Sequence, residues 1–257
     1  MRGLLRRPAE LLDRLGQGPV DPCDKGWHLP KKLPLAVWLC AIAMFVTAYG
    51  FMWCYVHVRA DMQPCLTRLP DPLFGVIPYD RAWYFVTHDI YEVLTILIVA
   101  TFFLQALRGE HRPIVRFGTA LAIQALLRSS TIVLLPLCRW TVEPGTIVLD
   151  EVPLLDLGIA KIPWRVWASN DLVFSGHVGE FVIITLIARP WPRTLRGALI
   201  VFQLVQAYAL VATRGHYTVD VLLAVPCAFF ANAAAVALLS LLVRFSKDAT
   251  LPRPEAA

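Results

Sequence analysis

Two short polar stretches lie inside otherwise apolar sequence in the C-terminal half of this chain. The first is Ser169-Asn-Asp-Leu-Val-Phe-Ser-Gly-His177, and the second is Arg214-Gly-His-Tyr-Thr-Val-Asp220. We call them the first and second polar islands. Ionisable side chains are costly within or beside a lipid-embedded helix, so their presence there indicates a function by default. The rest of the sequence predicts a scaffold that brings the two islands together.

The composition indicates a membrane protein. The chain has 257 residues, of which 57% are hydrophobic and only 17% are charged, and its mean hydropathy is +0.59. Soluble domains are typically about 45–50% apolar and about 25% charged. Apolar runs of roughly 17–25 residues recur, the length needed to cross a hydrocarbon core of about 30 Å. We therefore predict an all-α, polytopic integral membrane protein.

The apolar runs predict six membrane spans. These are Leu35–Val56, Trp83–Leu107, Ile114–Leu137, Leu172–Ala188, Leu195–Ala212 and Tyr217–Val243. Residues 35–243 would then form one catalytic membrane domain, flanked by polar, basic tails at 1–34 and 244–257. A cleaved signal peptide is not expected, because about thirty polar and basic residues precede the first apolar run.

Basic residues gather on one side of this predicted topology. The N-terminal segment, the connections at 108–116 and 189–196, and the C-terminal tail are all rich in arginine or lysine. By the positive-inside rule both termini are cytoplasmic, and the two islands face the lumen, periplasm or exterior. The same rule accounts for the net charge of +5, so we expect no nucleic-acid partner. Cys65 and Cys138 fall near outer membrane ends, which leaves a disulfide between them open.

The second island contains a histidine and a carboxylate at helical spacing. His216 and Asp220 are four residues apart, so on a helix they lie on one face. A carboxylate beside an imidazole fixes its tautomer and supports a positive charge on it, as a nucleophilic or acid–base histidine requires. His177 adds a second imidazole from the first island at matching depth. A lone membrane histidine is more often a packing residue, but these three side chains together favour catalysis.

Other polar residues would bind an anionic substrate group. Ser175 and Gly176 could present backbone amides at a helix N-terminus, and Arg214 or Arg128 could supply a guanidinium for phosphate oxygens. Two histidines, a carboxylate and a cation suit phosphoryl transfer through a covalent phosphohistidine.

Some of these residues also have purely structural interpretations. Arg128 could instead form an ion pair with Glu92 or Asp89. For Glu180, three residues after His177, we favour a polar group tied to another helix. Tyr217 and Thr218 are expected to be an interfacial anchor and a helix-start residue rather than catalysts.

The motifs taken together resemble a known family. Ser175-Gly-His177 followed by His216-Tyr-Thr-Val-Asp-Val221 is similar to the sphingomyelin synthase group, a membrane branch of the type 2 phosphatidic acid phosphatase-like (PAP2-like) enzymes. Agreement extends, in order, to Leu69-Pro-Asp-Pro-Leu-Phe74, Glu92, and the run from Arg128 to Pro136. The resemblance covers about residues 35–243.

The resemblance implies transfer of a phospho-head-group, phosphocholine or phosphoethanolamine, from a glycerophospholipid to ceramide or a related lipid alcohol, with release of diacylglycerol. It implies His216 as the nucleophile, Asp220 as its partner and His177 as the acid–base group. Glu92, Asp171 and Tyr217 would be supporting residues. No metal or other cofactor is implied, and a homo-oligomer is left open.

The sequence also departs from the family pattern. Ser169-Asn-Asp171 replaces the usual Cys-Gly-Asp, and Val178 replaces the threonine that usually follows Ser-Gly-His. Head-group and acceptor therefore stay open, and with water as acceptor the enzyme would be a phospholipase C.

Three other functions compete with this hypothesis. A lipid phosphate phosphatase would usually carry KxxxxxxRP and PSGH motifs and an arginine five residues before its second histidine, where this chain has Val211. A metal-dependent hydrolase could use His177, Glu180, His216 and Asp220 as ligands. The non-enzyme alternative is a lipid transporter or scaffold, for which no inverted repeat is evident.

Overall fold

The computed structural model describes residues 29, 32–51, 70–134 and 175–248. Within these residues the chain forms α-helices and no strands, which confirms the all-α prediction there. The α-helices are α2 (Leu35–Phe51), α4 (Tyr91–Leu107), α5 (Arg112–Leu134), α6 (Gly176–Ile187), α7 (Arg193–Ala212) and α8 (Thr218–Asp248). Short 3-10 helices, η3 (Pro72–Gly75) and η4 (Arg81–Trp83), and a π-helix, η5 (Val86–Ile90), precede α4.

Three of the described helical segments are long and apolar enough to cross a membrane. They are Arg81–Leu107, Arg193–Ala212 and Thr218–Ser246. The helices α2 and α6 are apolar but shorter, and α6 has only 12 residues, equivalent to about 18 Å at 1.5 Å per residue. Length and composition therefore support three of the six predicted spans. The membrane crossings assigned to α2, α5 and α6 stay predictions.

The helix boundaries differ in detail from those expected. The second predicted span is one continuous apolar segment, but the chain enters it through η4 and η5 before α4 begins at Tyr91. The last helix continues through Arg244 to Asp248, past the expected end at Val243. Helical periodicity does not mark these boundaries, because the chain stays helical where η5 passes into α4 and helix-forming residues continue past Val243.

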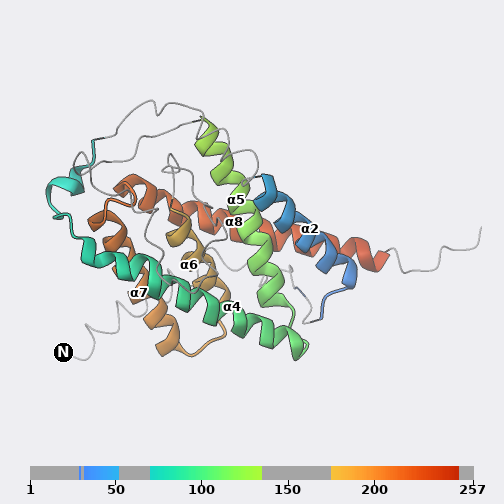
Figure 1. Ribbon diagram of the computed structural model, residues 1–257. Helices are drawn as coiled ribbons and strands as arrows, with labels where there is room; N and C mark the ends of the chain where they lie inside the picture. The colour runs from blue at the N-terminus through green and yellow to red at the C-terminus, as the bar shows by residue number, and fades with distance from the viewer. Residues whose placement is uncertain (1–28, 30–31, 52–69, 135–174, 249–257) are drawn as a thin grey trace, which may run out of the picture.

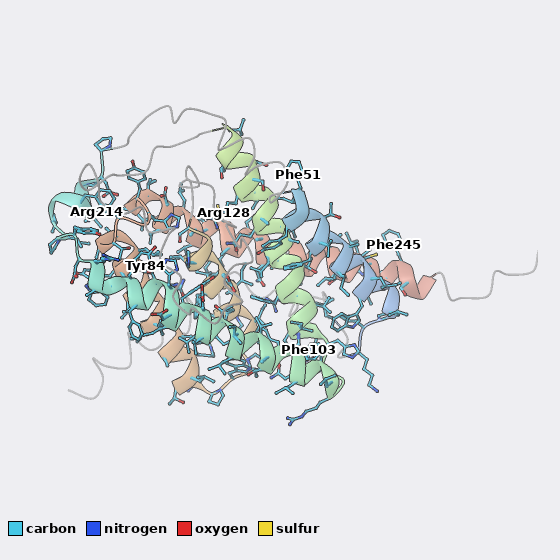
Figure 2. The ribbon with its side chains drawn as sticks, viewed as in Figure 1. Phe51, Tyr84, Phe103, Arg128, Arg214 and Phe245 are labelled. Carbon is cyan, nitrogen blue, oxygen red and sulfur yellow. The ribbon has the colours of Figure 1, made fainter. Side chains whose placement is uncertain are left out.

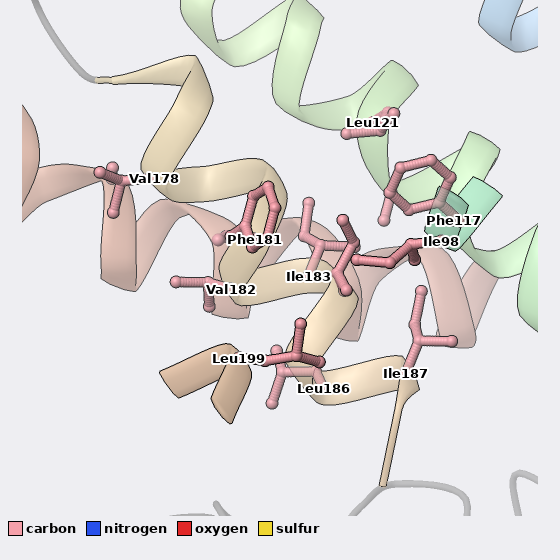
Figure 3. Packing of buried hydrophobic residues seen from close by; sticks show 14 of the residues in the cluster. Ile98, Phe117, Leu121, Val178, Phe181, Val182, Ile183, Leu186, Ile187 and Leu199 are labelled. Carbon is pink, nitrogen blue, oxygen red and sulfur yellow. The ribbon is translucent and has the colours of Figure 1, made fainter. Parts of the chain in front are cut away.

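The helix α6 lies at the centre of the bundle. It packs against α5, α7 and α8, while α2 lies beside α5 and α8 at the far end (Figure 1). The side chains of Phe181, Ile183 and Ile184 on α6 are fully buried. Figure 3 shows Phe181 and Ile183 packed together with residues of α4, α5 and α7, and Ile184 belongs to the same buried cluster. Because lipid tails are as apolar as these side chains, close packing rather than transfer from water holds such helices together.

His111 connects the start of α2 to the segment between α4 and α5. The Nδ1 atom of His111, between α4 and α5, accepts hydrogen bonds from the backbone N–H of Leu33 at 3.2 Å and from the indole Nε1 of Trp38 at 3.1 Å. The connection after α4 is thereby tied to the start of α2.

A glycine allows α5 to approach α6 closely. A Cβ atom added to Gly179 would lie 2.4 Å from the side-chain nitrogen of Gln124. That nitrogen is hydrogen-bonded to the carbonyl of Gly176 at 3.4 Å. Gln124 is only 4% exposed, so its carboxamide has little room to move aside. The small residue at 179 therefore sets the spacing between α5 and the helix that carries His177.

We expect Gly179→Ala to destabilise the protein by roughly 1–3 kcal/mol, because the added methyl group overpacks the contact with Gln124. The double variant Gly179→Ala/Gln124→Ala should recover part of this loss. Thermal unfolding in detergent measures both. The matched control is Gly118→Ala on α5, where an added Cβ meets nothing within 4 Å. Equal melting temperatures for Gly179→Ala and Gly118→Ala would contradict the spacing role.

Candidate active site

The second island forms the bend between α7 and α8. Asp220, in the first turn of α8, accepts a hydrogen bond from the backbone N–H of Tyr217 at 2.9 Å. The same carboxylate oxygen lies 3.5 Å from Nδ1 of His216. His216 is 6% exposed and Asp220 is fully buried. With Nδ1 beside the carboxylate, Nε2 is the ring nitrogen left for chemistry.

The first island meets the second through a backbone hydrogen bond. The N–H of Ser175 donates to the carbonyl of Asp220 at 3.1 Å. Ser175 is also the N-cap of α6, where its side-chain oxygen accepts from the N–H of Val178 at 3.4 Å. These contacts place the ring of His177 at 6.2 Å from the ring of His216, measured between centroids, in an edge-to-face arrangement. The structure thus brings together His177, His216 and Asp220 from two separate stretches of sequence.

A third histidine from the start of α4 adjoins the pair. The ring centroid of His88, in the π-helix η5, lies 6.0 Å from that of His177. Tyr91 lies closer, at 4.5 Å from the same ring, and Tyr84 stacks on His88 at 4.3 Å. Such π-helical turns are rare and frequently occur at functional sites. Sequence analysis missed the contacts of His88 and Tyr91 with His177, although their i, i+3 spacing places them on one helix face.

Asp71, the residue before η3, caps the start of α8. Asp71 accepts from the backbone N–H of Thr218, and its other oxygen accepts from the Thr218 hydroxyl at 2.8 Å. That second oxygen also accepts from the N–H of Leu73 at 2.9 Å, so it caps the 3-10 helix η3 as well. Thr218 is the first residue of α8, in agreement with its predicted role as a helix-start residue.

The guanidinium of Arg214 forms hydrogen bonds within the protein. Arg214 has a left-handed backbone conformation with φ of 57°, and its guanidinium donates to the carbonyls of Val211, Phe74 and Ile77 at 2.8–2.9 Å. The guanidinium also lies 4.3 Å from the ring centroid of Phe74. Burial lowers the pKa of this guanidinium, and the Asp71 carboxylate opposes that effect. These contacts fix the 72–77 segment against the bend.

Tyr217 belongs to the same packed junction. Its side chain is 2% exposed, and its ring stacks on Phe74 with centroids 5.6 Å apart. It is therefore a buried residue and not the interfacial anchor that its type suggested. The reason is that the 72–77 segment folds over it.

The remaining predicted site residues lie in different places. Arg128 is 4% exposed on α5, a helix that packs against α6. Figure 2 shows Arg128 near the middle of the molecule and Arg214 at one end, with Phe245 at the other. Glu92 is exposed in the first turn of α4. Asp171, Cys65 and Cys138 fall outside the described residues.

The metal-ligand set considered from sequence does not form a metal site within the described part of the chain. Among the described residues, no group of three or more His, Cys, Asp or Glu side chains is arranged to hold a metal ion. Glu180 accepts a hydrogen bond from the hydroxyl of Tyr91, which ties α6 to α4 as the sequence predicted.

Comparison with known protein families finds a match in the same part of the chain. Residues 169–233 match the family model described as PAP2 superfamily C-terminal, a range that includes both polar islands. No curated protein sequence matches the chain. The match supports a PAP2-like enzyme, and members of that superfamily are typically phosphatases or phosphotransferases acting on lipids.

We expect Asp71→Ala to lower stability by about 0.5–2 kcal/mol, the usual cost of losing a helix cap. Activity should fall with it, because the cap holds the turn that carries His216 and Asp220. Thermal unfolding and lipid turnover in detergent measure the two effects. Asp80→Ala is the control: Asp80 caps η4 through the N–H of Ala82 at 2.9 Å and lies outside this turn. If Asp80→Ala reduced turnover as much as Asp71→Ala, the cap would have no special role in the site.

Proposed function

We propose that this protein is a membrane lipid phosphotransferase that moves a phospho-head-group from a glycerophospholipid to a lipid alcohol such as ceramide. One observation carries the proposal: two imidazoles and a buried carboxylate from separate islands meet, with His216 Nδ1 3.5 Å from Asp220 and the rings of His177 and His216 6.2 Å apart. The PAP2-like match over the same residues supports lipid phosphate chemistry.

In the first half-reaction, Nε2 of His216 attacks the phosphorus of the donor phospholipid. A P–N bond forms and the bond from phosphorus to the glycerol oxygen breaks. His177, protonated beforehand, gives its proton to that oxygen, and diacylglycerol leaves. Asp220 stabilises the positive charge that develops on the imidazole of His216.

In the second half-reaction, neutral His177 takes the proton of the acceptor hydroxyl. The acceptor oxygen attacks phosphorus, the P–N bond breaks, and both histidines return to their starting states. Ceramide as acceptor gives a phospho-head-group ceramide. Water as acceptor gives free phosphocholine or phosphoethanolamine, which is phospholipase C activity.

The phosphate oxygens need a cation, and we assign this role to Arg128. It is a buried cation on α5, the helix that packs against the His177-bearing helix α6. The guanidinium of Arg214 donates to three backbone carbonyls, so we assign it the role of holding the 72–77 segment in place.

We further propose that the helices form the six-span topology with both termini cytoplasmic. Arg214 lies at one end of the described molecule and Phe245 at the other (Figure 2). The basic connections at 108–116 and 189–196 favour the cytoplasmic side for the end opposite the islands. The site would then face the lumen, periplasm or exterior and take phospholipid from that leaflet.

The test is incubation of the purified protein with labelled phosphatidylcholine or phosphatidylethanolamine, with and without ceramide. Wild-type protein should release diacylglycerol and form a phospho-head-group ceramide. His177→Ala and His216→Ala should each lose activity by about 10²–10⁴-fold or more, because an acid–base group or the nucleophile is gone. Mass spectrometry of the lipid products and of the His216 peptide measures turnover and the phosphoenzyme.

The control variant is His111→Gln, which keeps a hydrogen-bond acceptor at a histidine far from the site and should retain activity. Full turnover by folded His177→Ala and His216→Ala variants would refute the mechanism. Release of phosphate from phosphatidic acid, with no diacylglycerol from either phospholipid, would instead identify a lipid phosphate phosphatase.

A further inference from the structure

A partly buried hydrogen bond connects α4 and α6 beside His177. The hydroxyl of Tyr91 donates to the Glu180 carboxylate. Tyr91 is 7% exposed, and Glu180 lies three residues after His177 on the same helix. A hydrogen bond in a low-dielectric interior is electrostatically stronger than one in water, so this bond restrains the tyrosine ring.

The tyrosine ring lies against the imidazole of His177. Its centroid lies 4.5 Å from that of His177 and 5.5 Å from that of Phe181, one turn further along α6. Tyr91 therefore contacts both the proposed acid–base residue and the core of α6. Among the described ring contacts of His177, that with Tyr91 is closer than those with His88 and His216.

The helix α4 has a local reason to present this ring. The π-helix η5 ends at Ile90, and Tyr91 is the first residue of α4, with its N–H bonded to the carbonyl of His88. This junction directs both His88 and Tyr91 toward His177. A tyrosine here differs from a phenylalanine only by the hydroxyl that reaches Glu180.

We propose that Tyr91 and Glu180 are positioning residues: Glu180 holds the Tyr91 ring, and the ring fixes the plane of the His177 imidazole for proton transfer. The inference rests on the proposed function, since it assigns His177 as the acid–base group. Neither residue needs to touch the substrate. Proton transfer requires the donor and acceptor at hydrogen-bond distance, so a small rotation of the imidazole slows the reaction without weakening substrate binding.

Four variants separate positioning from stability. Tyr91→Phe keeps the ring and loses the hydroxyl, and Glu180→Leu loses the acceptor. Each should lower kcat by about 10-fold with KM nearly unchanged. Glu180→Gln keeps an acceptor for the tyrosine hydroxyl and should stay within about 3-fold of wild type.

The double variant Tyr91→Phe/Glu180→Leu is the decisive one. Replacing both partners of a buried hydrogen bond by apolar groups is nearly neutral for stability, whereas removing one partner is costly. The double variant should therefore melt close to the wild-type temperature while its kcat stays as low as that of either single variant. Recovery of kcat together with the melting temperature would show a purely structural pair and overturn the proposal.

The control is Tyr208→Phe on α7, whose ring contacts Trp83 at 5.1 Å and lies apart from the Tyr91–Glu180 pair. It should leave kcat unchanged. A second readout does not require turnover: modification of His177 by diethyl pyrocarbonate, followed by peptide mass spectrometry. We expect several-fold faster modification in Tyr91→Phe and in the double variant, because a loosened ring exposes the nitrogens.

The two proposals fail in different ways. If wild-type protein turned over none of the donor lipids, the proposed function would fail, while the modification rate of His177 would still test the positioning pair. If wild type were active but Tyr91→Phe and the double variant matched it in kcat and in His177 modification, the positioning role alone would fail.

Discussion

The start of α8 depends on one physical requirement: the backbone N–H groups at a helix start have no partner within the helix and need other acceptors. Two carboxylates meet that requirement, since Asp220 accepts from Tyr217 and Asp71 accepts from Thr218. An unsatisfied backbone donor in an apolar interior costs several kcal/mol, so this arrangement is strongly preferred. Asp220 also lies beside His216, so the group that completes the helix is the one that orients the histidine.

The same turn connects segments that are far apart in sequence. The carbonyl of Asp220 accepts from Ser175, which brings the first turn of α6 and His177 to the bend. Arg214 donates hydrogen bonds to the carbonyls of Phe74 and Ile77 and so holds the 72–77 segment over the same junction. A polar residue whose chemistry suggests a function can thus have a structural role. When carbonyls accept hydrogen bonds from a guanidinium, fewer of its N–H donors remain for a substrate.

The packing of α6 around His177 depends on a different set of contacts. The first turns of α6 lie against α5 at Gly179, and against α4 through Tyr91. Helices in a membrane gain little from hydrophobic transfer, so close contacts at small residues and buried polar pairs determine how they fit. Both kinds of contact occur within one turn of His177. The position of the imidazole is therefore set by the packing of three helices rather than by α6 alone.

The sequence by itself determined the helical membrane class, the two islands and the pairing of His216 with Asp220. Each of these follows from local information: run length, hydropathy, and a four-residue spacing that a helix converts into contact. It also indicated Thr218 as a helix start and Glu180 as a tie to another helix. The count of membrane spans did not follow with the same certainty, because α6 is shorter than the apolar run that contains it.

Only the tertiary structure decided which distant groups meet. Asp71 caps α8, Arg214 donates to the carbonyl of Phe74, and both His88 and Tyr91 lie beside His177. The partners in each of these contacts are 85 or more positions apart in the sequence and belong to different elements. Residue type and local periodicity carry no information about such pairings. They depend on how the helices cross and on which buried donors still need acceptors once the helices have packed.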